Sequence, residues 1–431
     1  MKKVLIITYY WPPSGGGGVQ RWLKFVKYLP QFGWEPVVYT PENPEYPSLD
    51  QSLNKDVSPD LKILKQPIFE PYGFYKQFVG LKKDDRINTG FLSENKKPKK
   101  AEGIAVWIRG NLFIPDARKF WIKPSIKYLS EYLKDNPVDV VVSTGPPHST
   151  HLIGLGLKKK LGVKWIADFR DPWTNIDFYK ELKLSKWADR KHHRLEQKVL
   201  DNADGIIGVG KGYIANLLPI PKTTPVKVIT NGFDEADFEN LSKDDQGKFT
   251  ISHFGSMNKT RNPMGLWRAL SHIKKNNPDI INNLTVKLFG KNDHQVMASA
   301  QEFGLDDCVK TIDYLPHNEM MQELVNSSIL LLMINKVKNA DRIIPGKVFE
   351  YIGSGKPILG LGSPESEIAE IINESGAGKM FDWDDAKGIE KFIFGILENK
   401  NRDQLNKNKF KYSRKHLTSK LVQLFDEIAN H

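Results

Sequence analysis

Short apolar segments alternate with longer amphipathic stretches along most of this 431-residue chain, and the alternation starts again in the second half. This pattern is typical of parallel sheets whose strands are joined by helices. A chain of this length also exceeds the usual limit of a single hydrophobic core. The sequence therefore predicts an α/β protein with two doubly wound domains in tandem. The expected strands are residues 4–8, 37–40, 138–143, 163–168, 205–209, 249–254, 284–289, 309–314, 329–334 and 357–361.

A turn signal places the domain boundary near Asn231-Gly232, where Asn-Gly follows a strand-like run. We expect an N-terminal domain over residues 1–231 and a C-terminal domain over 232–431. Residues 41–135 do not follow the alternation and are expected to form an irregular insertion. The chain ends in a basic helix, about 402–429, for which packing back on the N-terminal domain is one expectation.

The net charge of +12 is concentrated in the first half of the chain. Residues 1–231 contain 37 Lys and Arg against 23 Asp and Glu, whereas residues 232–431 contain 26 against 28. A basic domain next to a neutral one indicates an anionic partner. Nucleic acid, anionic lipid headgroups and phosphorylated carriers all fit the charge alone.

The expected insertion mixes aromatic and basic residues. Residues 69–78 mix five aromatic residues with one lysine, Lys82-Lys83 follows, and 96–100 is a run of lysines around one proline. Rings at the headgroup level and cations facing acidic lipid are typical of segments at a membrane surface. A solvated, partly disordered insertion is the alternative.

Cysteine and hydropathy restrict the class further. Cys308 is the single cysteine, which excludes a disulfide framework and a cysteine-based metal cluster and indicates a reducing compartment. No run of about 18 apolar residues occurs, so no membrane span is predicted. The apolar run that starts at Val4 is short and is interpreted as a strand rather than a signal peptide.

The segment 343–359 has the strongest functional pattern. It is typical of a loop, a short helix, a glycine-terminated helix end and a buried strand. Lys347 and Glu350 are three residues apart and share one face at the helix start, next to the amide of Gly346. Free amides beside a lysine suit a diphosphate, and a carboxylate one turn on suits a ribose diol. The segment therefore predicts a nucleotide-sugar site, the alternative being a surface Lys–Glu pair.

A glycine-rich loop follows the first predicted strand and leads into a helix. Gly16, Gly17 and Gly18 would let a phosphate approach the backbone at the helix start. The loop matches neither the G-x-G-x-x-G fingerprint nor a P-loop.

Taken together, these motifs resemble the family 4 glycosyltransferases, which have the GT-B fold of two Rossmann-like domains facing a cleft. The resemblance covers nearly the whole chain and rests on four segments: 15–18, 168–173, 231–234 and 345–357. The last looks like the family's donor motif, in which two glutamates lie eight positions apart and the later one holds the ribose. Glu350 matches the later glutamate, and Arg342 occupies the position of the earlier one, which contacts the donor sugar in the family.

The resemblance also implies a role for basic residues after the first strand of the second domain. Gly255 ends that strand, and Lys259 and Arg261 follow it. Cations there would stabilise the leaving diphosphate without a metal ion. We therefore expect neither a metal nor a cofactor. Arg342 would help to neutralise the diphosphate.

Polar residues after two strand ends of the first domain complete the expected site. Asp171 is expected to orient or deprotonate the acceptor hydroxyl, and Arg170 to contact a phosphate; an internal Arg–Asp pair that shapes the turn is the alternative. His148 is expected either on the acceptor side or as a cap of the next helix. His192 and His193 are interpreted as part of a solvated helix face.

The resulting prediction is a retaining glycosyltransferase that moves a sugar from a nucleoside diphosphate donor to a polysaccharide or polyprenyl-linked glycan acceptor. It is expected in the cytoplasm, at the inner face of the cell membrane. One alternative is a GT-B-fold nucleotide-sugar epimerase. A basic nucleic-acid-binding or scaffold protein is another, although no known nucleic-acid module is visible.

Overall fold

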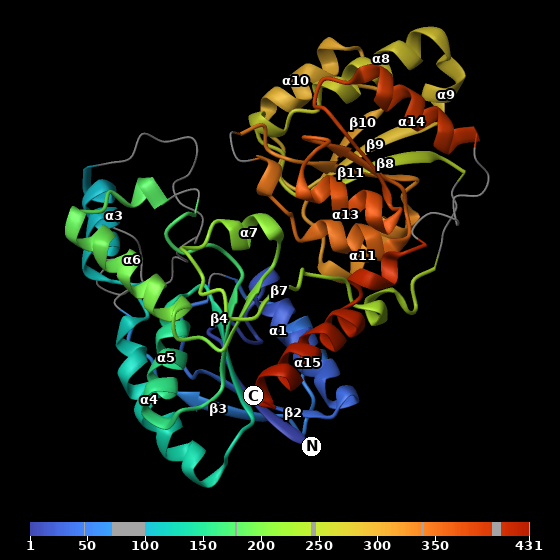
Figure 1. Cartoon of the computed structure of the whole chain (residues 1–431). Coiled ribbons are helices and arrows are strands. Elements are labelled where there is room, and N and C mark those ends of the chain that lie inside the picture. Colours follow the sequence, from blue (N-terminus) through green and yellow to red (C-terminus); the bar gives the residue numbers. More distant parts are fainter. Residues whose placement is uncertain are drawn as a thin grey trace. The chain divides into compact units, whose positions relative to one another are not determined.

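The computed structural model describes residues 1–46, 48–70, 100–176, 179–242, 247–337, 340–398 and 407–430, with side chains from residue 106 onward in the third range. The chain divides into two compact units (Figure 1). Unit 1 comprises Met1–Thr230 and Leu417–His431, and unit 2 comprises Asn231–His416.

Unit 1 is built on a parallel sheet of seven strands in the order β3-β2-β1-β4-β5-β6-β7. Five of these strands are those expected from the apolar runs. β3 lies inside the region that we expected to be irregular, so that expectation is wrong for this segment. β7 is short and exposed throughout, so no apolar pattern marks it. The strands are β1 (Lys2–Ile7), β2 (Trp34–Pro41), β3 (Lys62–Gln66), β4 (Val140–Gly145), β5 (Trp165–Phe169), β6 (Gly205–Gly208) and β7 (Val226–Val228).

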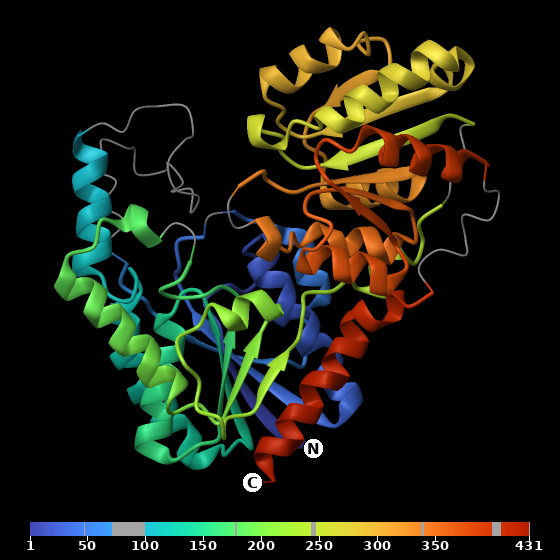
Figure 2. The same ribbon diagram turned by 45° about the horizontal axis from the view of Figure 1, so that its top comes forward.

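Helices cover both faces of this sheet (Figure 2). Side chains of alternate residues along each strand point to opposite faces. Thus Val4 and Ile6 pack with α1 and α15, whereas Leu5 and Ile7 pack with α4, α5 and α6. Two of the helices, α3 and α4, also lie in the region expected to be irregular. The helices are α1 (Gly17–Tyr28), α3 (Lys100–Leu112), α4 (Lys119–Asp135), α5 (Ser149–Leu161), α6 (Lys186–Leu200) and α7 (Lys211–Ala215), with 3-10 helices η1 (Leu29–Phe32), η2 (Gln51–Asp56) and η3 (Tyr179–Leu182).

The last helix, α15 (Arg414–Ala429), begins later than the expected residue 402, and residues 402–406 lie outside the described part. From Leu417 onward it belongs to unit 1, which agrees with the expectation that the last helix packs back on the N-terminal domain, although the predicted domain bounds assigned it to the second domain. Leu421, Leu424 and Phe425 are fully buried in the core beside β1 and β4. The end of the chain therefore helps to complete the N-terminal core.

Unit 2 is a parallel sheet of six strands in the order β10-β9-β8-β11-β12-β13. One core lies between the sheet and α8, α10 and α14, and the other between the sheet and α11, α12 and α13. The strands are β8 (Phe249–Phe254), β9 (Leu284–Phe289), β10 (Val309–Ile312), β11 (Ile329–Met333), β12 (Ile358–Leu361) and β13 (Gly378–Phe381). The helices are α8 (Met264–Asn276), α9 (Pro278–Asn282), α10 (His294–Glu302), α11 (His317–Asn326), α12 (Lys347–Ser354), α13 (Glu367–Ser375) and α14 (Ala386–Glu398), with 3-10 helices η4 (Glu235–Phe238), η5 (Lys259–Arg261), η6 (Ala340–Arg342) and η8 (Lys409–Tyr412).

Each sheet has one point at which the strand order reverses direction. It lies between β1 and β4 in unit 1 and between β8 and β11 in unit 2. Open α/β sheets bind ligands outside the carboxyl ends of the strands at such a point. The prediction of two doubly wound domains is confirmed, and the topology directs attention to the loops after these four strands.

Two expectations about membranes meet the structure differently. None of the helices in the described ranges is long and apolar enough to cross a bilayer. Most of the aromatic and basic insertion, from residue 71 to residue 99, lies outside the described residues.

Candidate functional site

A lysine fills the space next to the end of β8 in unit 2. The Lys347 ammonium donates a hydrogen bond to the carbonyl of Phe254, the last residue of β8. Gly255 follows with φ of 125°, a conformation that favours glycine. A Cβ atom at Gly255 would lie 2.5 Å from Lys347 Nζ. Glycine at this position therefore allows both the backbone turn and the approach of the lysine.

Arg261 joins the loops on the two sides of the unit 2 switch point. Its Nη1 donates to the carbonyl of Ser256 at 3.1 Å, and its Nε donates to Asn335 Oδ1 at 2.5 Å. Ser256 follows β8, and Asn335 lies just after β11. Our sequence analysis missed Asn335, although its place directly after a predicted strand was a usable signal.

Two cations lie close together at this point. Burial, and next the neighbouring Arg261 guanidinium, lower the pKa of Lys347 to about 8, with Glu350 opposing the shift. An anion placed here would relieve the repulsion between the two cations and favour the charged lysine. The site is therefore suited electrostatically to a phosphate or diphosphate.

The start of α12 lies beside these cations. Gly346 is the N-cap residue, is exposed, and has open space around its Cα. Glu350 lies in the first turn and is half-buried. The structure thus brings Glu350, Lys347, Arg261 and Gly255 to one place, and their expected contacts with a donor stay predictions.

Two other predicted donor residues are placed differently. Lys259 is exposed at the beginning of η5, the 3-10 helix that ends with Arg261. Arg342 is exposed at the end of η6. Their expected contacts with the donor stay predictions.

Arg170 joins three loops at the switch point of unit 1. Nη1 donates to the carbonyl of Gly18 at 2.9 Å, and Nη2 donates to the carbonyl of Pro146. A Cβ atom at Gly18 would lie 2.5 Å from Arg170 Nη1, so a larger residue would displace the guanidinium. The guanidinium therefore braces the loops after β1, β4 and β5. The predicted phosphate contact of Arg170 stays a prediction.

The glycine loop presents the start of α1. Gly16 is the N-cap residue, with φ of 95°, and Gly17 is the first residue of the helix. Both are exposed, so the first amides of α1 are accessible to an anion. The expected phosphate contact of this loop is consistent with that geometry and stays untested.

Asp168, at the end of β5, is part of the core. It is fully buried and accepts hydrogen bonds from Arg21 at 2.8 and 3.2 Å, from Trp22 at 2.7 Å and from Thr144 at 2.8 Å. Burial alone would raise its pKa, but the Arg21 charge and these hydrogen bonds hold the pKa of Asp168 below its usual value. Asp168 therefore ties α1 to the sheet.

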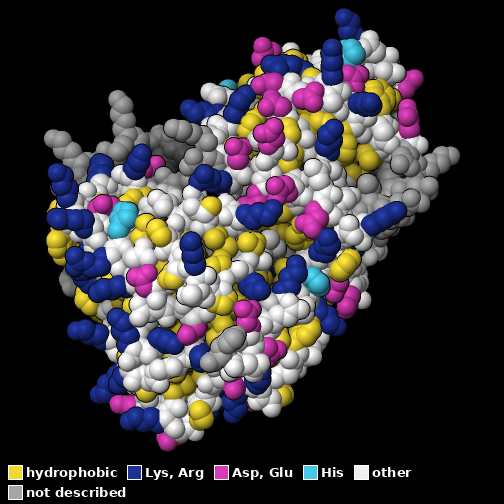
Figure 3. Space-filling view, in the orientation of Figure 1, with side chains coloured by type: hydrophobic (Ala, Val, Ile, Leu, Met, Phe, Trp, Pro, Cys, Tyr) yellow, Lys and Arg dark blue, Asp and Glu magenta, His cyan; other side chains and the backbone are white. Residues whose placement is uncertain are grey.

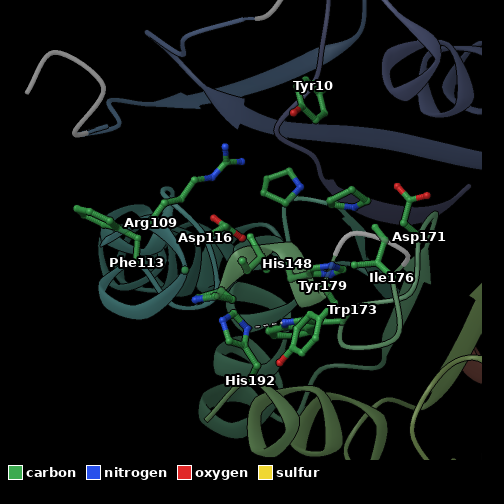
Figure 4. A pocket seen from close by; sticks show the side chains of 15 residues that line it. Tyr10, Arg109, Phe113, Asp116, His148, Asp171, Trp173, Ile176, Tyr179 and His192 are labelled. Atoms are coloured by element: carbon green, nitrogen blue, oxygen red, sulfur yellow. Dashed lines mark hydrogen bonds between the residues drawn. The ribbon is translucent and has the colours of Figure 1, made fainter. Parts of the chain in front are cut away.

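A pocket of about 370 Å³ opens beside these loops in unit 1 (Figure 4). In Figure 4, His148 and Trp173 lie in the middle of the pocket, Arg109 lies on one side and Asp171 on the other. Aromatic and apolar side chains form most of the wall. The lining residues are Tyr10, Arg109, Gly110, Phe113, Pro115, Asp116, Pro146, Pro147, His148, Asp171, Trp173, Ile176, Tyr179, Leu182 and His192.

His148 stacks on Trp173, with ring centroids 4.5 Å apart and planes 3° apart. Burial, followed by the nearby His151, holds the pKa of His148 well below its usual value, so the ring is neutral at physiological pH. Its side chain does not cap α5. Asp116 does so instead, by accepting hydrogen bonds from the amide and hydroxyl of Ser149 at 2.9 and 2.7 Å.

His192 corrects another expectation. It is buried and accepts a hydrogen bond from Trp173 Nε1 at 3.1 Å, so it is not on a solvated face. It lies four residues from two other buried positions of α6, Ala188 and Glu196. That helical spacing is the signal that sequence reasoning missed.

Comparisons with known proteins identify the fold. No protein-family model and no curated protein sequence matches this chain. Among solved structures it is similar to a glycosyltransferase from Rickettsia africae ESF-5, with 14% identity, a TM-score of 0.59 and coverage of 99% of this chain and 98% of that one. An E. coli structure described as trehalose-6-phosphate bound with UDP-2-fluoro glucose has 7% identity, a TM-score of 0.58 and 99% coverage of both chains. A putative UDP-N-acetylglucosamine 2-epimerase from Listeria monocytogenes has 15% identity, a TM-score of 0.54 and coverage of 99% and 97%.

These similarities extend over nearly the whole of each chain and include both sheets. At such low identity they establish the architecture. The protein therefore has the GT-B fold, with one candidate site at the switch point of each unit.

Proposed function

We propose that this protein is a retaining glycosyltransferase, similar to family 4, that uses a nucleoside diphosphate sugar. The observation that carries the proposal is the grouping of Lys347, Arg261 and Glu350 at the switch point of unit 2. The similar GT-B structures include proteins named for glycosyl transfer and one bound to a UDP sugar. Both lines support a nucleotide-sugar donor.

In the proposed donor complex, the diphosphate lies between Lys347 and Arg261, at the exposed amides that begin with Gly346. Glu350, one turn into α12, accepts hydrogen bonds from the ribose hydroxyls. The two cations stabilise the negative charge that develops on the leaving diphosphate. Lys259 and Arg342 add positive charge at the edge of the site, and no metal ion is required for this role.

The acceptor is a hydroxyl of a polysaccharide or of a polyprenyl-linked glycan, and it enters the pocket of unit 1. Asp171 orients or deprotonates that hydroxyl, with neutral His148 and Trp173 forming the wall beside it. Arg170 holds the glycine loop in place. The anomeric configuration of the sugar is retained because the acceptor hydroxyl attacks from the same face that the diphosphate leaves. Such an attack needs no pair of carboxylates like that of a retaining glycosidase.

A thermal-shift screen of UDP, GDP, ADP and TDP tests the donor site. A nucleotide at about a hundred times its dissociation constant adds roughly 2.7 kcal/mol to the stability of the folded protein. We expect one of the four to stabilise the wild type. Glu350→Ala should lower the affinity for that nucleotide about 10- to 100-fold, because a charge-assisted hydrogen bond is lost.

Glu319→Ala is the matched control. Glu319 also lies in the first turn of a unit 2 helix, α11, but it is exposed, and the helix start follows β10, the edge strand that is two places from β8 in the sheet. The Glu319→Ala variant should bind the nucleotide with the same affinity as the wild type. Equal affinity of the wild type and Glu350→Ala would contradict the proposal.

A nucleotide-sugar epimerase is the second candidate, because one structure of the same fold is named as such. The products separate the two activities. A transferase releases nucleoside diphosphate only as the acceptor is glycosylated, whereas an epimerase interconverts the intact nucleotide sugars without an acceptor. A nucleic-acid-binding protein would instead retain RNA or DNA at about 0.2 M salt, where loose phosphate contacts weaken sharply.

The proposed place of action is the cytoplasmic face of a membrane, where a polyprenyl-linked acceptor would be available.

A further inference from the structure

Exposed aromatic and apolar side chains gather where three helices of unit 1 meet. They lie at the end of α3, the start of α4 and the start of α6, and their exposed fractions are between 43% and 56%. We call them, together with the cations between and beside them, the α3–α4–α6 surface. Its apolar members are Trp107, Leu112, Phe120 and Trp187, and its cations are Lys119, Arg190, Lys191 and Arg194.

One face of α6 carries a tryptophan followed by cations. Trp187, Lys191 and Arg194 are spaced by four and three residues, so they lie on one side of the helix. All three are exposed. Among the described residues, neither Lys191 nor Arg194 has an ion-pair partner. The two acidic residues of α6 do not neutralise this face, because Glu196 is buried and Asp189 lies two residues from Trp187, on the other side of the helix.

Lysines lie over the aromatic rings of this surface. Lys191 Nζ is 4.7 Å from the ring centroid of Trp187. Lys119 Nζ is 5.0 Å from that of Phe120 and 5.3 Å from that of Phe113. Two of the aromatic rings of this surface, those of Trp187 and Phe120, are therefore paired with an ammonium group.

Hydrogen bonds hold the three elements together. Lys119 Nζ donates to the carbonyl of Leu112 at 2.6 Å, which joins α4 to α3. Asn111 donates to the carbonyl of Lys183 at 3.3 Å and accepts from the amide of Ser185 at 2.7 Å, which joins α3 to the start of α6. Burial and the nearby Lys191 lower the pKa of Lys119, so these two cations also face each other. The surface is a preformed unit rather than a set of separate side chains.

We infer that the α3–α4–α6 surface docks the protein onto an anionic lipid bilayer. Exposed aromatic rings at the headgroup level, flanked by lysine and arginine, are the chemistry that binds such an interface. No exposed acidic side chain lies on the cationic face of α6. This face therefore suits phospholipid headgroups, because every phospholipid headgroup carries a negatively charged phosphate. Figure 3 shows Lys and Arg side chains with hydrophobic ones along the side of unit 1 where Figure 1 places α3 and α6.

The surface continues into the candidate acceptor pocket. Phe113 and Arg109 line the pocket, and Phe113 also contacts Phe120, with ring centroids 6.2 Å apart. A bilayer at the α3–α4–α6 surface would therefore lie next to the pocket entrance. This extends the proposed function by placing a lipid-linked acceptor at that entrance, but the docking itself does not depend on transfer.

The test is sedimentation of the full-length protein with vesicles of phosphatidylcholine, with or without phosphatidylglycerol, at about 0.15 M ionic strength. The wild type should bind the anionic vesicles and leave the neutral ones largely unbound. Lys191→Ala/Arg194→Ala should bind roughly 25-fold more weakly, about fivefold for each charge removed. Trp187→Ser should bind roughly tenfold more weakly, because the variant lacks the apolar surface of the indole ring that the wild type buries in the bilayer.

Lys159→Ala/Lys160→Ala is the matched control. These two exposed lysines end α5, at the opposite edge of the same sheet from the start of α6. Substitution of these two lysines should leave the binding to anionic vesicles unchanged. All substituted residues are exposed, and circular dichroism confirms that each variant is folded.

Three outcomes would overturn the inference. They are no binding of the wild type to anionic vesicles, equal binding to neutral vesicles, and equal losses in the control and in Lys191→Ala/Arg194→Ala. None of these results depends on nucleotide binding or on activity, so a failure of the docking surface is distinguishable from a failure of the proposed reaction.

Discussion

At the scale of single residues, charge and burial decide what the candidate sites can do. Lys347 is half-buried and Asp168 is fully buried, and each lies beside an arginine. Lys347 faces a like charge and its pKa falls, whereas Asp168 faces an opposite charge and its pKa also falls, toward the ionised form. An anion bound beside Lys347 and Arg261 would reduce the repulsion between these two cations, whereas Asp168 and Arg21 already form an ion pair.

The lowered pKa of Lys347 predicts a pH-dependent affinity for nucleoside diphosphate. Below a pH of about 8 the free lysine is charged and binds the diphosphate fully. Bound diphosphate raises the pKa of Lys347. As the pH rises through the free value, binding requires uptake of a proton, and the affinity falls by up to about tenfold per pH unit.

Titration calorimetry from about pH 7 to about pH 9 measures this dependence. Lys347→Arg should lack it, because a guanidinium stays protonated over the whole range. Identical pH profiles for the two proteins would show that Lys347 does not contact the diphosphate.

Asp168→Asn should destabilise unit 1 by about 3–5 kcal/mol, because it leaves the buried Arg21 charge uncompensated. Urea unfolding followed by fluorescence measures this loss. The Arg21 side chain is 1% exposed and that of Asp168 is 0% exposed, which is why the cost is large. Asp426→Asn, which removes an exposed pair with Lys2, should cost less than about 1 kcal/mol.

The sign of the pH effect follows from the direction of the shift. Since the pKa of Asp168 is lowered on folding, its contribution is present above the pKa of the unfolded state and is lost as the pH falls through the folded value. The difference in stability between the wild type and Asp168→Asn should therefore shrink in acid. A constant difference would argue against an ionised Asp168.

At the scale of elements, strand ends and helix starts carry the candidate chemistry, and buried faces carry the stability. The loops after β1, β4 and β5 are held by Arg170, and the loops after β8 and β11 by Arg261. In both units, a single guanidinium fixes the backbone at the switch point. Loops held in this way keep the amides at the starts of α1 and α12 in position for an anion.

The terminal helix α15 gives an element-scale prediction. Phe425→Ala should lower the stability of unit 1 by about 3–5 kcal/mol, because a fully buried ring is removed from the core beside β1 and β2. Hydrogen exchange should become faster in β1 and β2. Phe410→Ala is the control, since Phe410 is 52% exposed, and it should leave exchange in β1 and β2 unchanged.

Unchanged exchange in Phe425→Ala would mean that α15 contributes little to the core of unit 1, contrary to its burial.

At the scale of the whole molecule, the sequence predicted the architecture well. Two series of apolar runs indicated two parallel sheets, and all ten predicted strands are present because short apolar runs between turns are a local signal. The region from 41 to 135 was predicted poorly. β3 is an edge strand with little apolar pattern, and the helical spacing in α4 is interrupted by Pro124, so local signals there were weak.

The sequence by itself determined the fold class and the residue types near the predicted donor site. Lys347 and Glu350 were predictable together because they share one turn of one helix. Only the tertiary structure decided which other residues join them. Phe254 is 93 positions from Lys347, Asn335 is 74 positions from Arg261, and Gly18 is 152 positions from Arg170. The strand order brings such distant loops to one edge of a sheet, and no local pattern records that order.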